Sequence, residues 1–193
     1  MNLVRNACPS DYIGKKAIKP KEFESLTSPI IIFSGAVGSW VNTRLLRKVA
    51  EKYTTVLVGK EFGKECPSNV INLGTKTHDE LYNYYAYSDV CLLPFDTKQE
   101  VTQAACAIKM FEHMAAGKIT VATKWSETEL YPGSVLAAES EEEFLTYVNR
   151  AVEISNNSFY TNRSLQYARE NTWEKRFEII HNVLNEQYLV KGM

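Results

Sequence analysis

The sequence predicts an α/β fold in which helices cover both faces of a doubly wound parallel sheet of about six strands. Short apolar runs rich in β-branched residues recur along the chain, as expected of strands buried on both faces. Segments with helical spacing of apolar residues separate these runs, which indicates βαβ units and a parallel sheet. The 193 residues suit one domain with a substantial core. The pattern is typical of a Rossmann-like domain.

The first part of the chain supplies the first three predicted strands. Residues 1–28 are polar and contain prolines, so we interpret them as a lead-in segment. An apolar run from Pro29 to Phe33 ends in a glycine-containing turn and is the first strand. A helix is expected over 40–52, with strands at 54–59 and 69–74.

Helix-capping signals organise the rest of the chain. Thr77 and Glu80 have capping-box spacing, as do Ser140 and Glu143, so each pair is expected to open a helix. Gly117 is expected to end a helix. The remaining predicted strands are 89–94, 119–122 and 134–137, and the remaining predicted helices are 104–116, 158–169 and 171 to about 188, the last with an apolar stripe from Trp173 to Tyr188. The predicted division is a lead-in and interdomain crossover segment (1–28), the α/β domain (29–170) and a closing helix of the same domain (171–193).

Composition excludes several classes of function. Lys+Arg 22 against Asp+Glu 23 gives a net charge of -1, so no global basic field attracts nucleic acid or an anionic membrane. No apolar run approaches the roughly 18 residues of a membrane helix, and the first residues lack a signal-peptide core. The four cysteines, at 8, 66, 91 and 106, have no zinc-site spacing. We expect a cytoplasmic location and no metal.

A ligand site is expected where the parallel strands end. Such sheets bind ligands at the carboxyl ends of their strands, beside a topological switch point. The loops at that edge are 35–40, 59–63, 74–78, 94–103 and 123–128. Gly59 and Gly74 therefore join the candidate site by position, as the residues at the ends of the second and third predicted strands.

The first loop has the composition of a phosphate-binding turn. Gly35 and Gly38 let the backbone approach a ligand, and the following helix offers free N–H groups. An anion would then lie beside Ala36 and Ser39. The alternative is a tight turn that needs a positive φ.

The loop 94–103 leads into an alanine-rich segment that is sterically open. An anion could lie there against the amides of Thr102, Gln103, Ala104 and Ala105. A solvated loop with a small-residue packing contact explains the same residues.

Lys109 and Glu112 are the strongest candidates for chemistry. Glu112 lies beside the buried stripe of its predicted helix, where a carboxylate can accept two hydroxyl hydrogen bonds from a ribose diol. Lys109, three residues earlier, can face the same space and meet a phosphate. The alternative is a surface lysine–glutamate pair of little energetic weight. His78, His113 and His181 are interpreted as structural residues.

The order of these segments resembles the C-terminal, nucleotide-sugar-binding domain of bacterial GT-B glycosyltransferases of the group 1 type. The residues 33–40 (FSGAVGSW), 89–95 (DVCLLPF) and 108–118 (IKMFEHMAAGK) resemble that domain's first strand, its later "aDv.liPf" strand and its "iKlyEymAaGkPvV" helix. Residues 3–7 resemble the crossover between domains, and 172–174 the start of the closing helix. The match runs over roughly residues 3–188.

The resemblance implies that the chain is one half of a GT-B fold and binds a nucleotide diphosphate-sugar. Glu112 matches the family's ribose-binding glutamate, and Gly74, Thr75 and Lys76 match the loop that lines the base. The loop 35–40 and the amides near 102–106 match the diphosphate contacts. Lys109 is assigned to stabilisation of the leaving phosphate.

The resemblance also implies partners for the domain. An N-terminal domain would bind the acceptor, which is a glycan or a lipid-linked acceptor. The domain alone would bind donor weakly and transfer nothing. The full-length protein would be cytoplasmic, or peripheral at the inner face of the membrane. No cofactor or metal is implied. Apolar surface that normally faces the partner domain would allow a homodimer of the fragment.

Departures from the family pattern keep another class of function open. Many relatives have a glutamate where this chain has Ala104, and basic residues after the first strand where it has Ala36. A degenerate or regulatory nucleotide-binding domain without transfer activity is therefore the alternative. A nucleotide-sugar epimerase would need further carboxylates and a histidine in the cleft, and a flavodoxin-like signalling domain an acidic cluster after the first strand; neither set is apparent.

Overall fold

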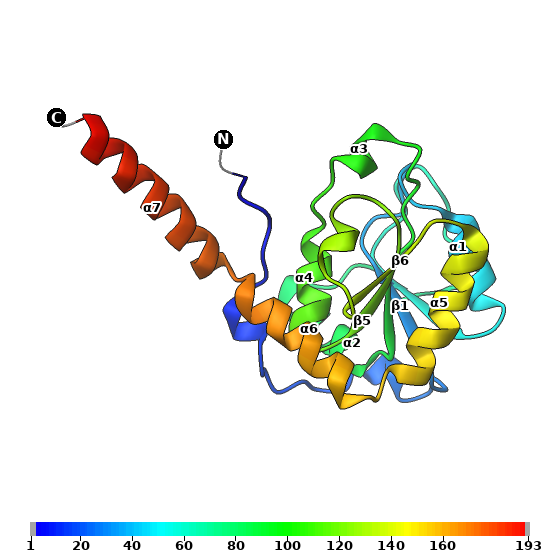
Figure 1. The fold of residues 1–193 in the computed structure, drawn as a ribbon. Helices are drawn as coiled ribbons and strands as arrows, with labels where there is room; N and C mark the ends of the chain where they lie inside the picture. Colours follow the sequence, from blue (N-terminus) through cyan, green and yellow to red (C-terminus); the bar gives the residue numbers. More distant parts are fainter. Residues whose placement is uncertain (1–2, 192–193) are drawn as a thin grey trace.

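The computed structural model describes residues 3–191, with side chains up to residue 186, and has the predicted fold class. Within these residues one sheet contains six parallel strands (Figure 1). The strands are β1 Ile30–Ser34, β2 Thr54–Val58, β3 Ile71–Asn72, β4 Val90–Leu93, β5 Ile119–Thr123 and β6 Val135–Ala138.

The order of the strands creates a switch point beside β1. Across the sheet the order is β3-β2-β1-β4-β5-β6, so the chain builds outward from β1 and then returns to its other side. The loops after β1 and β4 therefore leave the sheet in opposite directions, and a crevice opens between them. This is the edge at which the sequence places the binding site.

Helices cover both faces of the sheet. Figure 1 shows α1 and α5 on one side and α2, α4 and α6 on the other, and α4 packs on both α2 and α6. The α-helices are α1 Thr43–Ala50, α2 His78–Tyr87, α3 Glu100–Gln103, α4 Ile108–Ala115, α5 Glu141–Ile154, α6 Ser158–Glu170 and α7 Trp173–Lys191. Short 3-10 helices occupy Ser10–Tyr12, Lys21–Phe23 and Thr128–Leu130.

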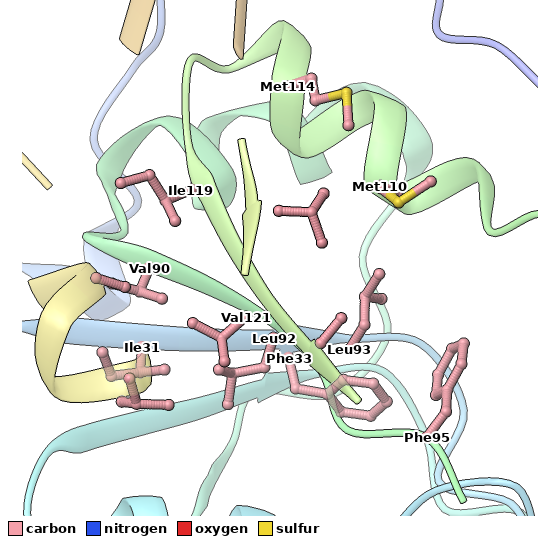
Figure 2. Close-up of a cluster of buried hydrophobic side chains, with 14 of the residues drawn as sticks. Ile31, Phe33, Val90, Leu92, Leu93, Phe95, Met110, Met114, Ile119 and Val121 are labelled. Atoms are coloured by element: carbon pink, nitrogen blue, oxygen red, sulfur yellow. The ribbon is translucent and has the colours of Figure 1, made fainter. Parts of the chain in front are cut away.

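The central strands are buried on both faces, as their composition predicts. All five residues of β1 are buried, and Ile30 and Ile32 pack in a cluster with Phe23 and Tyr85. A larger cluster joins β1, β4 and β5 to the methionines Met110 and Met114 of α4 (Figure 2). This packing fixes α4 against the strands whose carboxyl ends form the site.

Three capping predictions agree with the structure. Ser140 caps α5, and its Oγ accepts from the Glu143 N–H at 3.1 Å. Thr77 caps α2, and the Glu80 carboxylate accepts from its N–H at 2.9 Å. Gly117 ends α4 with φ +70, and its N–H donates to Met114 O at 2.9 Å. The first-helix prediction was too long, since Asn42 caps α1 and its side chain accepts from Leu45 N at 3.3 Å.

The helix predicted over 104–116 was wrong at its start. The chain instead forms the short helix α3 and a turn, and α4 begins at Ile108. The carbonyl of Ala105 accepts from the Trp125 indole at 2.8 Å, and that of Cys106 accepts from the Asn6 amide. These bonds replace the helical hydrogen bonds that the alanine-rich segment would otherwise form.

The lead-in segment packs on the domain. Tyr12 and Phe23 are buried, and Cys8 forms a parallel bridge with Thr172 at the start of the last helix. Arg176 donates to the carbonyls of Arg5 and Asn6 from that helix. The lead-in segment and the start of α7 therefore meet at one corner of the domain.

Helix α7 extends away from the sheet (Figure 1). On the predicted apolar stripe, Phe177, Ile180 and Leu184 are exposed by 66%, 43% and 48%. The side chain of Tyr188, the last residue of that stripe, lies outside the described residues. In the part of the chain described, no helix is long and apolar enough to cross a membrane.

Candidate functional site

An open cavity of about 460 Å³ lies at the carboxyl ends of β1 and β2, against α2 and α4. Its lining combines backbone with basic, acidic and apolar side chains. The lining residues are Ser34, Gly35, Ala36, Val58, Gly59, Lys60, Thr75, Lys76, His78, Leu81, Tyr85, Ile108, Lys109 and Glu112. We call this space the nucleotide-side cavity.

Two glycines, Gly35 and Gly59, bring the main chain to the surface of this cavity, and we call them the glycine floor. A Cβ at Gly59 would collide with the carbonyl of Gly35, and a Cβ at Gly35 would collide with the Lys109 ammonium. Gly35 also has φ +118, which L side chains rarely adopt. The Gly59 N–H donates to Gly74 O at 2.9 Å and so aligns the loop after β3.

Glu112 is a carboxylate buried in the wall of the cavity. It is only 4% exposed, and its Oε2 accepts a hydrogen bond from the Tyr85 hydroxyl at 3.2 Å. Tyr85 and the Ser34 hydroxyl are 2.8 Å apart. Because a tyrosine hydroxyl has one proton, Ser34 is the donor to Tyr85 when Tyr85 donates to Glu112.

His78 approaches the second oxygen of Glu112. Its Nε2 lies 3.5 Å from Glu112 Oε1, and its ring stacks on Tyr12 with centroids 5.4 Å apart. Burial raises the pKa of Glu112, while the nearby charges of His78 and Lys109 and the Tyr85 hydrogen bond oppose that rise. The carboxylate is thus oriented by two neighbours on α2, with one face toward the cavity.

Lys109 carries its ammonium to the end of β1. Its Nζ donates to the carbonyl of Ser34 at 2.5 Å and lies 5.2 Å and 5.7 Å from the ring centroids of Phe33 and Phe95. Burial lowers the pKa of Lys109 to about 8, and the charge of Glu112 opposes this effect. A cation held this close to backbone glycines suits an anionic ligand.

A second cavity of about 340 Å³ adjoins the first through Lys109. Apart from Lys109 and Thr102, its lining side chains are hydrocarbon or aromatic. The lining residues are Trp40, Phe95, Val101, Thr102, Ala105, Ala107 and Lys109. We call this space the apolar cavity.

The structure brings together half of the sequence-predicted site. The residues of that set that line the nucleotide-side cavity are Gly35, Ala36, Gly59, Thr75, Lys76, Lys109 and Glu112. Lys76 lines it with its ammonium paired to Glu22 at 2.6 Å. The alternative interpretation, a surface lysine–glutamate pair, is wrong. Glu112 is buried, and Lys109 donates to the carbonyl of Ser34.

The other predicted residues lie elsewhere. Thr102 and Ala105 line the apolar cavity, whereas Gly38, Ser39, Gly74, Gln103 and Ala104 line neither cavity. The amides of residues 102–105 all donate to nearby carbonyls, because α3 and its turn use them. The expectation that they form a free helix N-terminus was therefore wrong for this conformation. Gly38 instead accommodates the Trp40 ring, which a Cβ would strike.

Sequence reasoning missed His78, Tyr85 and Ile108 as lining residues. The sequence predicts a structural role for His78, although it is the last residue of the loop 74–78. Ile108 has the spacing of the apolar residues of α4, yet it is 42% exposed and lines the cavity. The position of His78 beside a predicted ligand loop is the signal that could have found it.

His113 lies on α4 but turns away from both cavities. It is fully buried, with Nδ1 3.1 Å from the Thr120 hydroxyl and the ring edge against Tyr85. Burial lowers the pKa of His113 to about 3. The ring is therefore neutral at ordinary pH. Across residues 3–191 no group of three or more metal-binding side chains gathers.

Comparisons with known proteins identify the family. The family model described as "Glycosyl transferases group 1" matches residues 28–153, which is more than half of the chain. No curated protein matches the chain in sequence.

Solved structures share the fold at low sequence identity. A glycosyltransferase of Rickettsia africae has TM-score 0.68 and 12% identity, with 95% of this chain and 56% of that one covered. Anabaena HepE in complex with UDP-glucose has TM-score 0.67 and 15% identity, with 95% and 54% covered. WaaG, a glycosyltransferase involved in lipopolysaccharide biosynthesis, has TM-score 0.65 and 14% identity, with 87% and 52% covered. The chain thus spans about half the length of these structures and has the fold of one half of GT-B.

Proposed function

Because the chain belongs to the group 1 glycosyltransferases, we propose that it binds the nucleotide diphosphate-sugar donor of such an enzyme. In this proposal the full-length protein is a hexosyltransferase that moves the sugar to a glycan or a lipid-linked acceptor. The observation that carries it is the pairing of a buried, oriented carboxylate, Glu112, with the cation Lys109 in one cavity.

The nucleoside would occupy the nucleotide-side cavity. Glu112 offers two carboxylate oxygens to a ribose diol, which donates two hydroxyl protons. Thr75 and Leu81 offer one polar and one apolar wall to the base. The glycine floor leaves the main chain close enough to meet the ribose and the phosphates without intervening side chains.

The diphosphate would lie beside Lys109. Transfer breaks the bond between the sugar's C1 and the β-phosphate oxygen, and that oxygen keeps the electron pair. Negative charge therefore grows on the phosphate as the bond breaks, and a preorganised ammonium stabilises it. The acceptor hydroxyl forms the new bond to C1 and releases a proton. We place the group that receives this proton on a second domain or on the substrate.

The remaining features of the proposal follow from the family. A second domain would bind the acceptor, so the described domain alone would bind donor without transferring sugar. The enzyme would need no metal, because Lys109 supplies positive charge at the leaving group. It would work in the cytoplasm or at the inner face of a membrane. Exposed apolar residues of α7, such as Phe177 and Ile180, would allow the chain to dimerise when no second domain covers them.

Ligand-observed NMR of the chain with UDP, GDP, ADP and CMP tests this proposal. One nucleotide should bind in the millimolar range or tighter, and Glu112→Gln should weaken it about tenfold, because the amide can accept only one of the two ribose hydrogen bonds. Glu153→Gln, an exposed change on α5, is the matched control and should leave binding unchanged.

The outcomes separate the candidate functions. Equal binding to wild type and Glu112→Gln would contradict the proposed role of Glu112. The full-length protein could also bind a nucleotide sugar but neither transfer nor slowly hydrolyse the sugar. That result would support the alternative of a regulatory domain. The small residues Ala36 and Ala104 motivate that alternative, since the family resemblance leads us to expect charged side chains at both positions.

A further inference from the structure

We propose that the apolar cavity holds the sugar of the donor and selects a hexose that bears a methyl group, either N-acetylated or 6-deoxy. This inference rests on the proposed function and adds the class of sugar to it. It is carried by two observations: the lysine shared by the two cavities and the hydrocarbon lining of the apolar cavity.

The shared lysine sets the position of the sugar. Lys109 is the residue that lines both cavities, and its ammonium lies 5.7 Å from the ring centroid of Phe95, in the wall of the apolar cavity. A diphosphate beside this ammonium, with its nucleoside against Glu112, would direct its other end into the apolar cavity. The group at that end of a nucleotide sugar is the hexose.

The lining sets the chemistry that the cavity favours. Trp40 and Phe95 present aromatic rings, and Val101, Ala105 and Ala107 present hydrocarbon. Aromatic rings pack against the C–H faces of a hexose, whereas a sugar hydroxyl buried against hydrocarbon loses its hydrogen bonds to water. A methyl group in the same place gains from leaving water. The cavity therefore penalises a fully hydroxylated hexose relative to a methyl-bearing one.

Thr102 does not change the apolar character of this lining. It is 2% exposed, and its hydroxyl Oγ1 is covered by protein atoms and has no hydrogen-bond partner among the described residues. The wall therefore presents almost no polar surface to the sugar, and a sugar hydroxyl placed against it finds no partner there.

Calorimetric titration of the chain with matched donors tests the inference. UDP-glucose and UDP-N-acetylglucosamine form one pair, GDP-mannose and GDP-rhamnose the other, with UDP and GDP as references. In the pair whose nucleotide binds, the methyl-bearing sugar should bind about tenfold tighter than its hydroxylated counterpart, the discrimination that an apolar pocket gives for a group of this size.

Two variants locate the effect. Thr102→Val keeps the shape of the side chain and leaves the lining apolar, so thermal stability should hold or rise and the affinity gained from the methyl-bearing sugar should persist. Ala105→Leu fills the cavity and should abolish that gain. Neither change should alter the affinity for the nucleoside diphosphate alone. Thr146→Val, an exposed change on α5, is the control for both.

Failure of the inference and failure of the proposed function give different results in these titrations. If the diphosphate binds but both sugars of its pair bind equally, or the hydroxylated one binds tighter, the inference is overturned and the proposed function stands. If the preference appears but survives Ala105→Leu, the apolar cavity does not hold the sugar. If neither UDP nor GDP nor any of the four donors binds, the proposed function and the inference fall together.

Discussion

Helix α4 turns two different faces to the molecule, and the titratable groups on them differ in kind. Toward the cavities it presents Lys109 and Glu112, and toward the core it presents His113 with the methionines of Figure 2. Burial lowers the pKa of both basic groups, to about 8 for Lys109 but to about 3 for His113. Lys109 therefore keeps its charge at neutral pH, whereas His113 does not.

The difference shows what a buried charge requires. Lys109 has the Ser34 carbonyl as an acceptor, the aromatic faces of Phe33 and Phe95, and the nearby charge of Glu112. His113 has one neutral hydroxyl beside it, that of Thr120, and among the described residues no negative charge stabilises its protonated form. The cavity face is thus prepared for an ionic ligand, and the core face contributes packing.

Removing the charge of the cavity face should have the largest effect. Lys109→Met should weaken binding of a nucleoside diphosphate about a hundredfold, the contribution of a strong charge-assisted hydrogen bond. The same change should leave the melting temperature unchanged or raise it, because it removes a charge that is costly to bury. Calorimetric titration and thermal melts measure the two effects. The control is Lys52→Met, an exposed change on the loop after α1. If Lys109→Met binds the nucleoside diphosphate as tightly as wild type, the phosphates do not lie beside Lys109.

Raising the pH should remove the charge of Lys109 without a substitution and weaken binding by a smaller factor. A bound diphosphate raises the pKa of Lys109 above its free value of about 8. Affinity is therefore fully present below pH 8 and lost above it, falling about eightfold between pH 7.5 and 9 if one proton is linked. Titrations across this range measure the loss. Lys109→Met should flatten the profile, and an equally steep profile in that variant would assign the pH dependence to another group.

Acid should destabilise the folded protein through His113, on the core face of α4. His113 is neutral in the folded state but takes up a proton when unfolded, so its folded pKa lies below its unfolded one. Stability is therefore highest above about pH 6.5 and decreases as the pH falls toward 3, by about 1 kcal/mol between pH 6.5 and 5.5. Urea unfolding of wild type and His113→Gln measures the difference between their slopes. Parallel slopes would show that His113 is protonated to the same extent in both states.

The face of α4 that enters the core was predictable, and its beginning was not. Apolar periodicity and Gly117 specify the end of α4 and the strand after it. The start depends on bonds from Asn6 and Trp125, which are 100 and 20 residues away from the carbonyls they contact. Local propensity favours helix through the alanines, and only tertiary contacts redirect the chain there.

The candidate site was also predictable in part. Glycines at strand ends and the Lys109–Glu112 spacing are visible in the sequence, and they locate the nucleotide-side cavity. The partners of Glu112 are not visible, since Tyr85 and His78 reach it from α2 across the fold. The apolar cavity also escapes the sequence, because Trp40, Phe95 and Ala105 meet only after α3 has replaced the predicted helix start.

The glycine floor also limits how this cavity can evolve. At Gly59 any other residue would strike the carbonyl of Gly35, and at Gly35 it would have to adopt φ +118, so the floor has no side chain that selection can vary. Variation in the shape of the cavity must come from its walls, at positions such as Thr75, Leu81 and Ile108. Homologues that accept different nucleobases should therefore differ at these three positions and share the two glycines, which makes the walls the place to begin when the donor is to be changed by design.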